Sequence, residues 1–213
     1  MQIHSGPHNT SSFKNGLWWK VLICSLGILG LGTFSGLSSM GGFQEWYDGL
    51  NKPFFTPPNW LFGPAWSILY ILMGGSLAII WQIISISRYP IIKKFAKRGI
   101  VIFLIHLIFN LIWTPIFFKL HMTVLALVVI FIILAFIVIL IRHFYRLDRL
   151  SAFLLIPYLL WVSFATALNL AIVVLNWFLV LRLFHIENQY VIKKLGSIWF
   201  CVGRFKIYGF NWS

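Results

Sequence analysis

Aromatic and amide side chains recur at the spacing of one helix face, and together they suit the binding of a flat ligand. His106, Asn110 and Trp113 follow one another at i, i+4 and i+7, which brings them to one side of an α-helix. An imidazole, an amide and an indole in one row offer ring stacking and a few hydrogen bonds. We therefore expect this face to line a mostly apolar cavity with a small number of polar points.

Two further stretches carry the same kind of face. One of them comprises Phe62, Trp66, Tyr70 and Met73, and the other comprises Tyr158, Trp161, Ala165, Asn169 and Ile172. The small side chain of Ala165 leaves room beside the indole of Trp161. If the three faces converge, they enclose an apolar chamber in which a flat molecule is held by stacking and a few hydrogen bonds.

Each of these residues also has a purely structural interpretation. Asn110 and Asn169 are typical of the hydrogen bonds that hold apolar helices together. Trp113 and Trp161 are also compatible with an ordinary core. His106 could ligate a haem iron, although a lone histidine in an apolar helix more often bonds a neighbouring helix. We predict no metal site and no resident cofactor, because the two cysteines form no cluster with histidines.

The composition places these faces in a membrane. Hydrophobic residues make up 60% of the chain and charged residues 10%, whereas a soluble domain carries about 25% charged residues. Mean hydropathy is +0.90. A length of 213 residues has room for five or six spans of about 20 residues each. The predicted fold is all-α, a polytopic membrane protein built as a bundle of five transmembrane helices.

The apolar runs divide the chain into three parts. We predict a flexible N-terminus over 1–16, a transmembrane domain over 17–183 and a basic, aromatic tail over 184–213 that could lie along the membrane surface. The predicted helices cover 17–40, 60–87, 99–118, 122–141 and 151–183. Helix 122–141 is almost purely aliphatic, so we expect it to face lipid. Gly32 and Gly36 predict close helix packing, within the bundle in preference to between two copies.

The segment between the first two helices is rich in proline and aromatic residues. Pro53, Pro57 and Pro58 cannot continue a helix, because proline lacks the N–H and biases the preceding residue to extended backbone. Residues 41–59 therefore predict a stiff cover, and Tyr47 lies within it. We expect this cover to lie across the mouth of the chamber.

Charge is distributed along the chain in a way that predicts topology. The net charge is +13, and its basic residues fall between the apolar runs, which indicates contact with anionic lipid headgroups and not with nucleic acid. Segments 88–98 and 142–149 hold eight lysines and arginines, so the N-terminus is predicted to be cytoplasmic. We expect no charged side chain inside a span, which argues against an ion-coupled pump and against a hydrolase.

Three motifs resemble a known family. WYDGLNKPFFTPPNW begins at Trp46, HLIFNLIW begins at His106, and PYLLWVSFATALN begins at Pro157. In this order they are similar to the tryptophan-rich sensory protein/translocator protein family (TspO, the peripheral benzodiazepine receptor), over about 17–176. The resemblance implies five transmembrane helices, often paired as homodimers, and a cavity capped by the loop between the first two helices.

The resemblance also implies ligands. Family members bind porphyrins and other tetrapyrroles, benzodiazepine-type compounds and, in some cases, sterols. Some bacterial members degrade porphyrin in light with two cavity tryptophans, which match Trp66 and Trp161. The family's ligand-contacting positions match Tyr47, Tyr70, Asn110, Trp113 and Ala165. The sterol motif of animal members needs a tyrosine where this chain has Trp177 and Phe178, so that motif is not matched.

These observations favour a membrane receptor or sensor that binds porphyrin between Trp66 and Trp161, with basic residues of the loops meeting its propionates. The alternatives are a light-dependent porphyrin-degrading enzyme, in which the same two tryptophans would be catalytic, and a transporter of porphyrin or lipid. The expected partners are a small hydrophobic ligand, membrane lipid and a second copy of the chain.

Overall fold

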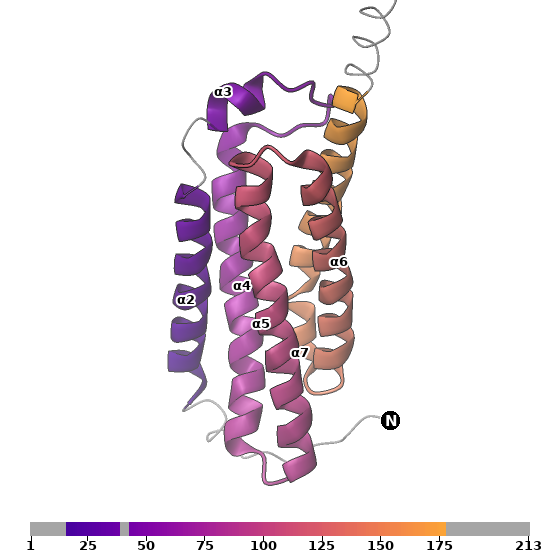
Figure 1. Cartoon of the computed structure of the whole chain (residues 1–213). Helices are drawn as coiled ribbons and strands as arrows, with labels where there is room; N and C mark the ends of the chain where they lie inside the picture. Colours follow the sequence, from indigo (N-terminus) through magenta and orange to yellow (C-terminus); the bar gives the residue numbers. More distant parts are fainter. Residues whose placement is uncertain (1–15, 39–42, 178–213) are drawn as a thin grey trace, which may run out of the picture. The chain divides into compact units, whose positions relative to one another are not determined.

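The computed structural model describes residues 16–38 and 43–177, the side chains of 43–45 excepted. The chain divides into two compact units, 1–172 and 173–213. The first unit is an antiparallel helix bundle (Figure 1). Of the second, residues 173–177 are described, and they are helical. The predicted flexible N-terminus and interfacial tail lie outside the described residues.

The described helices follow the apolar runs of the sequence. Their bounds are α2 Leu17–Leu37, α3 Phe43–Asp48, α4 Asn59–Ile86, α5 Pro90–Phe118, α6 Thr123–Tyr145 and α7 Arg149–Phe153, followed by a helix over 156–177. Five segments of the described chain are long and apolar enough to cross a membrane, with α7 and helix 156–177 counted as one. The predicted all-α fold with five transmembrane helices is confirmed.

The start of α5 differs from the prediction. The helix begins at Pro90 and not near Gly99, because proline at a first helical position has a suitable φ and no N–H that needs a partner. The basic residues predicted to lie in a loop therefore occupy the first turns of α5, and they include Lys93, Lys94, Lys97 and Arg98. Charge alone was a poor sign of a loop here, since lysine and arginine are good helix formers.

The last predicted helix, 151–183, begins as two pieces. Asp148 caps α7 by accepting the Ser151 N–H at 2.8 Å, and α7 ends at Phe153. Residues 154–155 form a turn before helix 156–177 begins. Pro157 lies in the first turn of that helix, where its missing N–H costs no hydrogen bond.

Two glycines let α2 and α4 approach closely. A Cβ at Gly32 would overlap the ring of Tyr70, and a Cβ at Gly74 would overlap the backbone of Ser25. The Ser25 hydroxyl also donates to the Ile71 carbonyl at 3.1 Å. Gly32 therefore packs inside the bundle, as predicted, whereas a Cβ at Gly36 would meet open space.

Helix α6 was predicted to face lipid, and that is true of one side only. Its other side is buried against the bundle, through Ala126, Val129, Ile130, Ile133, Ile137, Leu140 and Phe144. Aliphatic residues occupy both sides, so the sequence carries no contrast between a lipid-facing and a protein-facing stripe. Helices α5 and α6 are packed neighbours joined by a short turn in which His121 has a φ of 58°.

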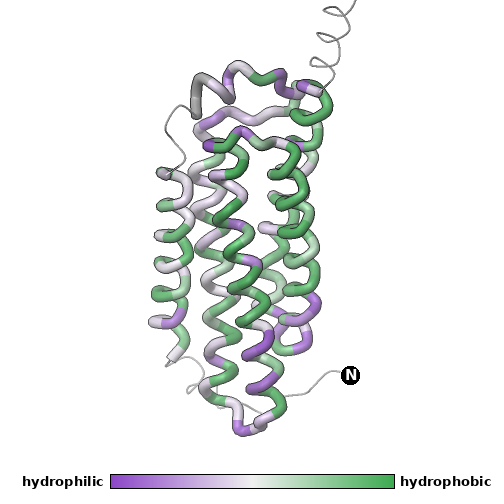
Figure 2. Tube along the Cα trace, viewed as in Figure 1, coloured by the Kyte–Doolittle hydropathy of each residue, from purple (hydrophilic) through white to green (hydrophobic). Residues whose placement is uncertain are grey.

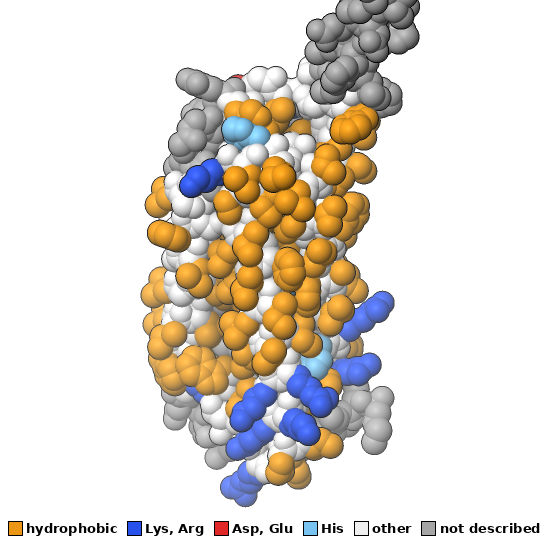
Figure 3. All heavy atoms as spheres, in the orientation of Figure 1, with side chains coloured by type: hydrophobic (Ala, Val, Ile, Leu, Met, Phe, Trp, Pro, Cys, Tyr) orange, Lys and Arg blue, Asp and Glu red, His pale blue; other side chains and the backbone are white. Residues whose placement is uncertain are grey.

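Polar residues gather at the two ends of the bundle and apolar residues between them (Figure 2). Lysine and arginine collect at the end where α5 begins and α6 finishes, far from α3 (Figure 3). Lys20 is only 4% exposed and lies in the first turn of α2, at the end of the span and not in its interior. Its ammonium group donates to Gln82 at 2.8 Å and lies 5.2 Å from the ring centre of Trp81.

Candidate functional site

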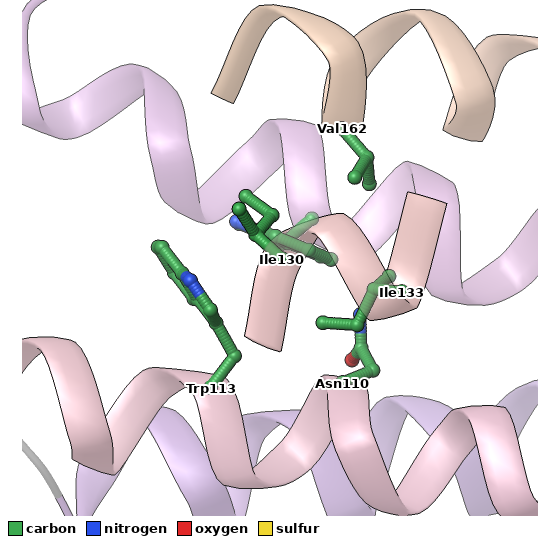
Figure 4. A pocket seen from close by; sticks show the side chains of 6 residues that line it. Asn110, Trp113, Ile130, Ile133 and Val162 are labelled. Atoms are coloured by element: carbon green, nitrogen blue, oxygen red, sulfur yellow. The ribbon is translucent and has the colours of Figure 1, made fainter. Parts of the chain in front are cut away.

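The predicted faces of α4, α5 and helix 156–177 meet around a small cavity, to which α6 adds a fourth wall. The lining residues are Trp66, Asn110, Trp113, Ile130, Ile133 and Val162, five of which are labelled in Figure 4. The cavity measures about 10 Å³. That is room for about one water molecule and not for a tetrapyrrole. The three helices converge, but helix 156–177 lines the cavity through Val162 and not through the predicted Trp161 or Ala165, and side chains fill most of the space.

Trp66, which lines this cavity, is in ring contact with two tyrosines. Its ring centre lies 5.4 Å from that of Tyr70 one turn further along α4, with the planes tilted by 32°. It lies 6.2 Å from Tyr158 of helix 156–177, nearly edge to face. These are favourable aromatic geometries. Trp66 therefore connects the α4 face with the face of helix 156–177.

A buried chain of hydrogen bonds runs beside Trp66. Asn110 donates its Nδ2 to the Tyr158 hydroxyl at 2.7 Å, and Tyr70 donates its hydroxyl to Asn110 Oδ1 at 3.3 Å. The Tyr158 hydroxyl and His106 Nε2 lie 2.9 Å apart. Because the Tyr158 oxygen accepts from Asn110, its own proton is free to go to His106 Nε2. His106 thus bonds a neighbouring helix, the interpretation that the sequence favoured over haem ligation.

Tyr158 is the residue that the sequence analysis undervalued. It was placed on the helix face but not among the ligand-binding residues. Its side chain is fully buried, with 0% exposure, and it contacts Trp66, His106 and Asn110. The sequence feature that could have identified Tyr158 as a site residue is its position one turn before Trp161, opposite the polar face of α5.

Trp161 carries an unsatisfied donor. Its ring lies 6.1 Å from Phe62 of α4 and 5.9 Å from Phe164. Its indole Nε1 is buried and has no hydrogen-bond partner in the described part of the chain. Ala165, one turn on, is buried at 8% exposure and adds little bulk. Phe62 and Trp66 are one turn apart on α4, as are Tyr158 and Trp161 on their helix, so the two tryptophans occupy neighbouring levels of one interface.

Trp113 lines the cavity, whereas Asn169 does not. Trp113 stacks on Phe117 at 5.3 Å and donates its indole N–H to the Ala126 carbonyl of α6 at 3.1 Å. The Asn169 amide, oriented so that both its atoms bond, donates to the Thr123 carbonyl at 3.1 Å and accepts the Leu127 N–H at 3.2 Å. Asn169 therefore joins two helices, which was the structural alternative for this residue.

The cover lies over the turn between α5 and α6. Trp46 stacks on His121 with ring centres 4.2 Å apart and planes 16° apart. Tyr47 is 2% exposed, and its ring centre lies 6.0 Å from that of Phe118. The ammonium group of Lys52 sits 4.2 Å above the Tyr47 ring. Burial raises the pKa of the Tyr47 hydroxyl further above neutral pH.

The second half of the cover reaches another helix. The ring of Phe55 lies 6.2 Å from that of Phe164, which in turn contacts Trp161. The cover is thus linked through aromatic contacts to the α5–α6 turn on one side and to the Trp161 cluster on the other. Its position over the site residues fits the predicted role of a lid.

The charges of the two ends bear on how an acidic ligand would be held. Lys93, Lys94 and Lys97 lie about 24–30 Å along α5 from Trp113, at 1.5 Å per residue. They cannot reach a ligand under the cover, so the expectation that basic loop residues meet propionates stays a prediction for other lysines. The described lysines at the covered end are Lys52 and Lys119.

Comparison with known proteins identifies the family. The TspO/MBR family model matches residues 22–175. The chain belongs to the TspO/MBR family. It is 38% identical over 159 residues to the tryptophan-rich protein TspO of Archaeoglobus fulgidus, a match that covers 74% of this chain and 97% of that protein.

Relatives with other names extend the family comparison. The tryptophan-rich sensory protein of Cereibacter sphaeroides is 35% identical over 134 residues, 63% of this chain and 78% of that protein. The human translocator protein is 33% identical over 143 residues, 65% of this chain and 80% of that protein. The resemblance found in the sequence is confirmed, and the chain is an integral membrane protein of this family.

Proposed function

We propose that this TspO/MBR family member is a membrane receptor for porphyrins and related flat, hydrophobic ligands. The observation that carries the proposal is a buried indole donor, Nε1 of Trp161, which has no partner in the described chain and is surrounded by aromatic rings. An unpaired buried donor costs about 1–3 kcal/mol. A ligand acceptor such as a carboxylate or a ring nitrogen would remove that cost, while the rings of Trp66 and Phe62 would stack on the macrocycle.

Binding requires the chamber to open. Sites for drug-sized ligands measure about 300–1,000 Å³, far above the cavity of about 10 Å³ beside Trp66. The contacts of the cover that we describe are ring contacts, worth about 0.5–1.5 kcal/mol each beyond burial. The free energy needed to lift the cover and turn the indoles can therefore be offset by a ligand that binds the open form more tightly than the closed form.

The names of relatives support the proposal at a coarser level. The Cereibacter sphaeroides protein is named a sensory protein and the human protein a translocator. A receptor of this kind would couple ligand binding to the position of the cover. The predicted cytoplasmic N-terminus is part of the same proposal, since the end rich in lysine and arginine would face the cytoplasm. Assembly into a homodimer also stays a prediction.

The decisive experiment is a titration with protoporphyrin in detergent, followed through the porphyrin absorbance. The chain has 11 tryptophans, so quenching of its fluorescence would not locate the ligand. We expect a Trp66→Phe, Trp161→Phe double variant to lose at least about tenfold in affinity, the equivalent of about 1.4 kcal/mol. Trp60→Phe is the matched control, because this indole is 71% exposed. Equal affinity in the double variant would remove the site.

A second candidate function is degradation of the bound porphyrin in light. One observation favours it: Trp66 is in ring contact with Tyr70 and Tyr158, two further side chains that can donate an electron. In this case Trp66 and Trp161 would be catalytic. Illumination would bleach the porphyrin absorbance in the wild type, and a Trp66→Phe variant that still binds would bleach it much more slowly. If the porphyrin absorbance stays stable under light, the enzyme function is excluded and the receptor function remains. Flux of porphyrin into proteoliposomes would indicate a transporter.

A further inference from the structure

A second candidate site lies at the opposite end of the bundle from the cover. The first four turns of α5 line an open groove of about 710 Å³. Its lining consists of Pro90, Lys93, Lys94, Lys97, Arg98, Val101 and Ile102. Basic side chains crowd this end of the molecule in Figure 3. Four cations on adjacent helical turns repel one another, so the groove is arranged for an anionic partner.

These cations have no carboxylate partner among the acidic side chains that the structure describes. Asp48 pairs with Lys52 at 2.9 Å at the other end of the bundle. Asp148 accepts the N–H of Ser151 as the cap of α7. The positive charge of the groove is therefore uncompensated by those groups. A phosphate could accept hydrogen bonds from several of the lysines and from the planar guanidinium of Arg98.

The groove changes from charged to apolar along the helix axis. Lys93 to Arg98 provide the charge, and Val101 and Ile102 continue the lining toward the middle of the span. Val101 is 55% exposed. From Lys97 to Ile102 the axis rises about 7 Å, at 1.5 Å per residue. A headgroup followed by acyl chains has this order of chemistry, whereas free phosphate would have no use for the apolar part.

The opposite side of this part of α5 is fixed against α6, so the groove is held in place. The Phe95 ring stacks on His143 at 3.9 Å, and the Phe95 carbonyl lies 2.9 Å from His143 Nε2. A Cβ at Gly99 would come within 2.8 Å of the same imidazole. These contacts set the rotation of α5 about its axis and direct the basic side outward. A preformed site loses less conformational freedom on binding.

We propose that this groove is a binding site for one anionic phospholipid. Its phosphate would lie among Lys93, Lys94, Lys97 and Arg98, and an acyl chain would lie along Val101 and Ile102. The proposal is independent of the porphyrin site, which lies at the covered end. It differs from a diffuse attraction to the membrane surface because it assigns the lipid to one face of one helix.

The test is native mass spectrometry of the full chain in a neutral detergent, with added phosphatidylglycerol or phosphatidylcholine. We expect one phosphatidylglycerol to remain bound at energies that remove phosphatidylcholine. Lys93→Gln, Lys97→Gln, Arg98→Gln should lower the bound fraction at least about tenfold. The matched control is Arg142→Gln, Arg146→Gln, Arg149→Gln, which removes three positive charges from the same end of the bundle and should retain binding within about twofold.

Three results would overturn the proposal. Equal losses in both triple variants would mean diffuse attraction, and no loss in either would mean that the groove is unused. Displacement of the lipid by millimolar inorganic phosphate would mean a plain anion site. If the groove triple variant does not fold, the single variant Lys97→Glu, at an exposed position, gives the same test through charge reversal. It should release phosphatidylglycerol and leave the thermal midpoint unchanged.

Discussion

Two interfaces of α4 are built in opposite ways. Toward α2 the contact uses glycine, and a Cβ at Gly74 would overlap the backbone of Ser25. Toward α5 and helix 156–177 the contact uses large rings, among them Trp66 and Tyr158, around a cavity of about 10 Å³. Glycine contacts bring backbones together and leave nothing to rotate, whereas ring contacts can be exchanged for contacts with a ligand. We therefore expect the first interface to stay closed and the second to open for a ligand.

The largest effect should come from filling the glycine interface. A Gly74→Val variant forces its side chain into the α2 backbone, and overpacking of this kind costs about 1–3 kcal/mol and occasionally more. We expect the purified variant to show a thermal midpoint lowered by several degrees, or not to fold. Gly36→Ala is the control, since a Cβ there meets open space, and it should leave the midpoint equal or slightly raised. Equal behaviour of the two variants would refute the difference between the interfaces.

The next effect concerns the polar chain within the ring interface. Tyr158→Phe removes the hydroxyl that bonds both His106 and Asn110, and it leaves two buried polar groups unpaired. The expected loss is about 1–3 kcal/mol of stability, visible in thermal unfolding. Ser163→Ala removes an exposed hydroxyl bonded to the carbonyl one turn earlier on the same helix and should change little. A Tyr158→Phe variant as stable as the wild type would mean that the network does not hold these helices.

A smaller effect is expected at the cover. Trp46→Ala removes the stack on His121, a contact worth about 0.5–1.5 kcal/mol. Because the cover would then open more often, bound porphyrin should dissociate several-fold faster, with a smaller change in association. Stopped-flow displacement measures this directly. The matched control is Phe54→Ala, whose ring is 100% exposed on the same segment, and an equal acceleration in both would argue against a clasp at Trp46.

The smallest effect belongs to the exposed ion pair of the cover. The hydrogen bond from Lys52 holds the pKa of the Asp48 carboxyl below its ordinary value. When folding lowers the pKa of a carboxyl, that group stabilises the folded state at pH values above its pKa in the unfolded chain. The stabilisation is lost as the pH falls through its pKa in the folded chain. Asp48 should therefore stay ionised between pH 5 and pH 8. The rate of porphyrin dissociation, measured by displacement, should not change over this range. A step in this range that Asp48→Asn abolishes would contradict the assignment.

The sequence predicted the parts that depend on length, apolarity and spacing. Five spans follow from five apolar runs, and the faces of Trp66 and Asn110 converge because i, i+4 spacing fixes the side of a helix on which a residue lies. The glycine contact at Gly32 was also predictable, since small residues mark close helix packing.

The remaining features depend on which helix lies opposite. Asn169 bonds the backbone of α6 at Thr123 and Leu127, and no property of Asn169 itself identifies that partner. The buried side of α6 could not be read because both of its sides are aliphatic. The size of the chamber depends on side-chain rotamers, which spacing does not determine. The basic turns of α5 were misplaced because a run of lysines is compatible with both loop and helix.

The most direct test is an experimental structure of the protein with protoporphyrin bound. Our account predicts the macrocycle between Trp66 and Trp161, with an acceptor atom within hydrogen-bond distance of Trp161 Nε1 and the cover above it. The α2–α4 interface should be unchanged, and the ring interface should be parted. A macrocycle bound on the lipid-facing surface or in the basic groove of α5, with both indoles placed as they are here, would contradict the account.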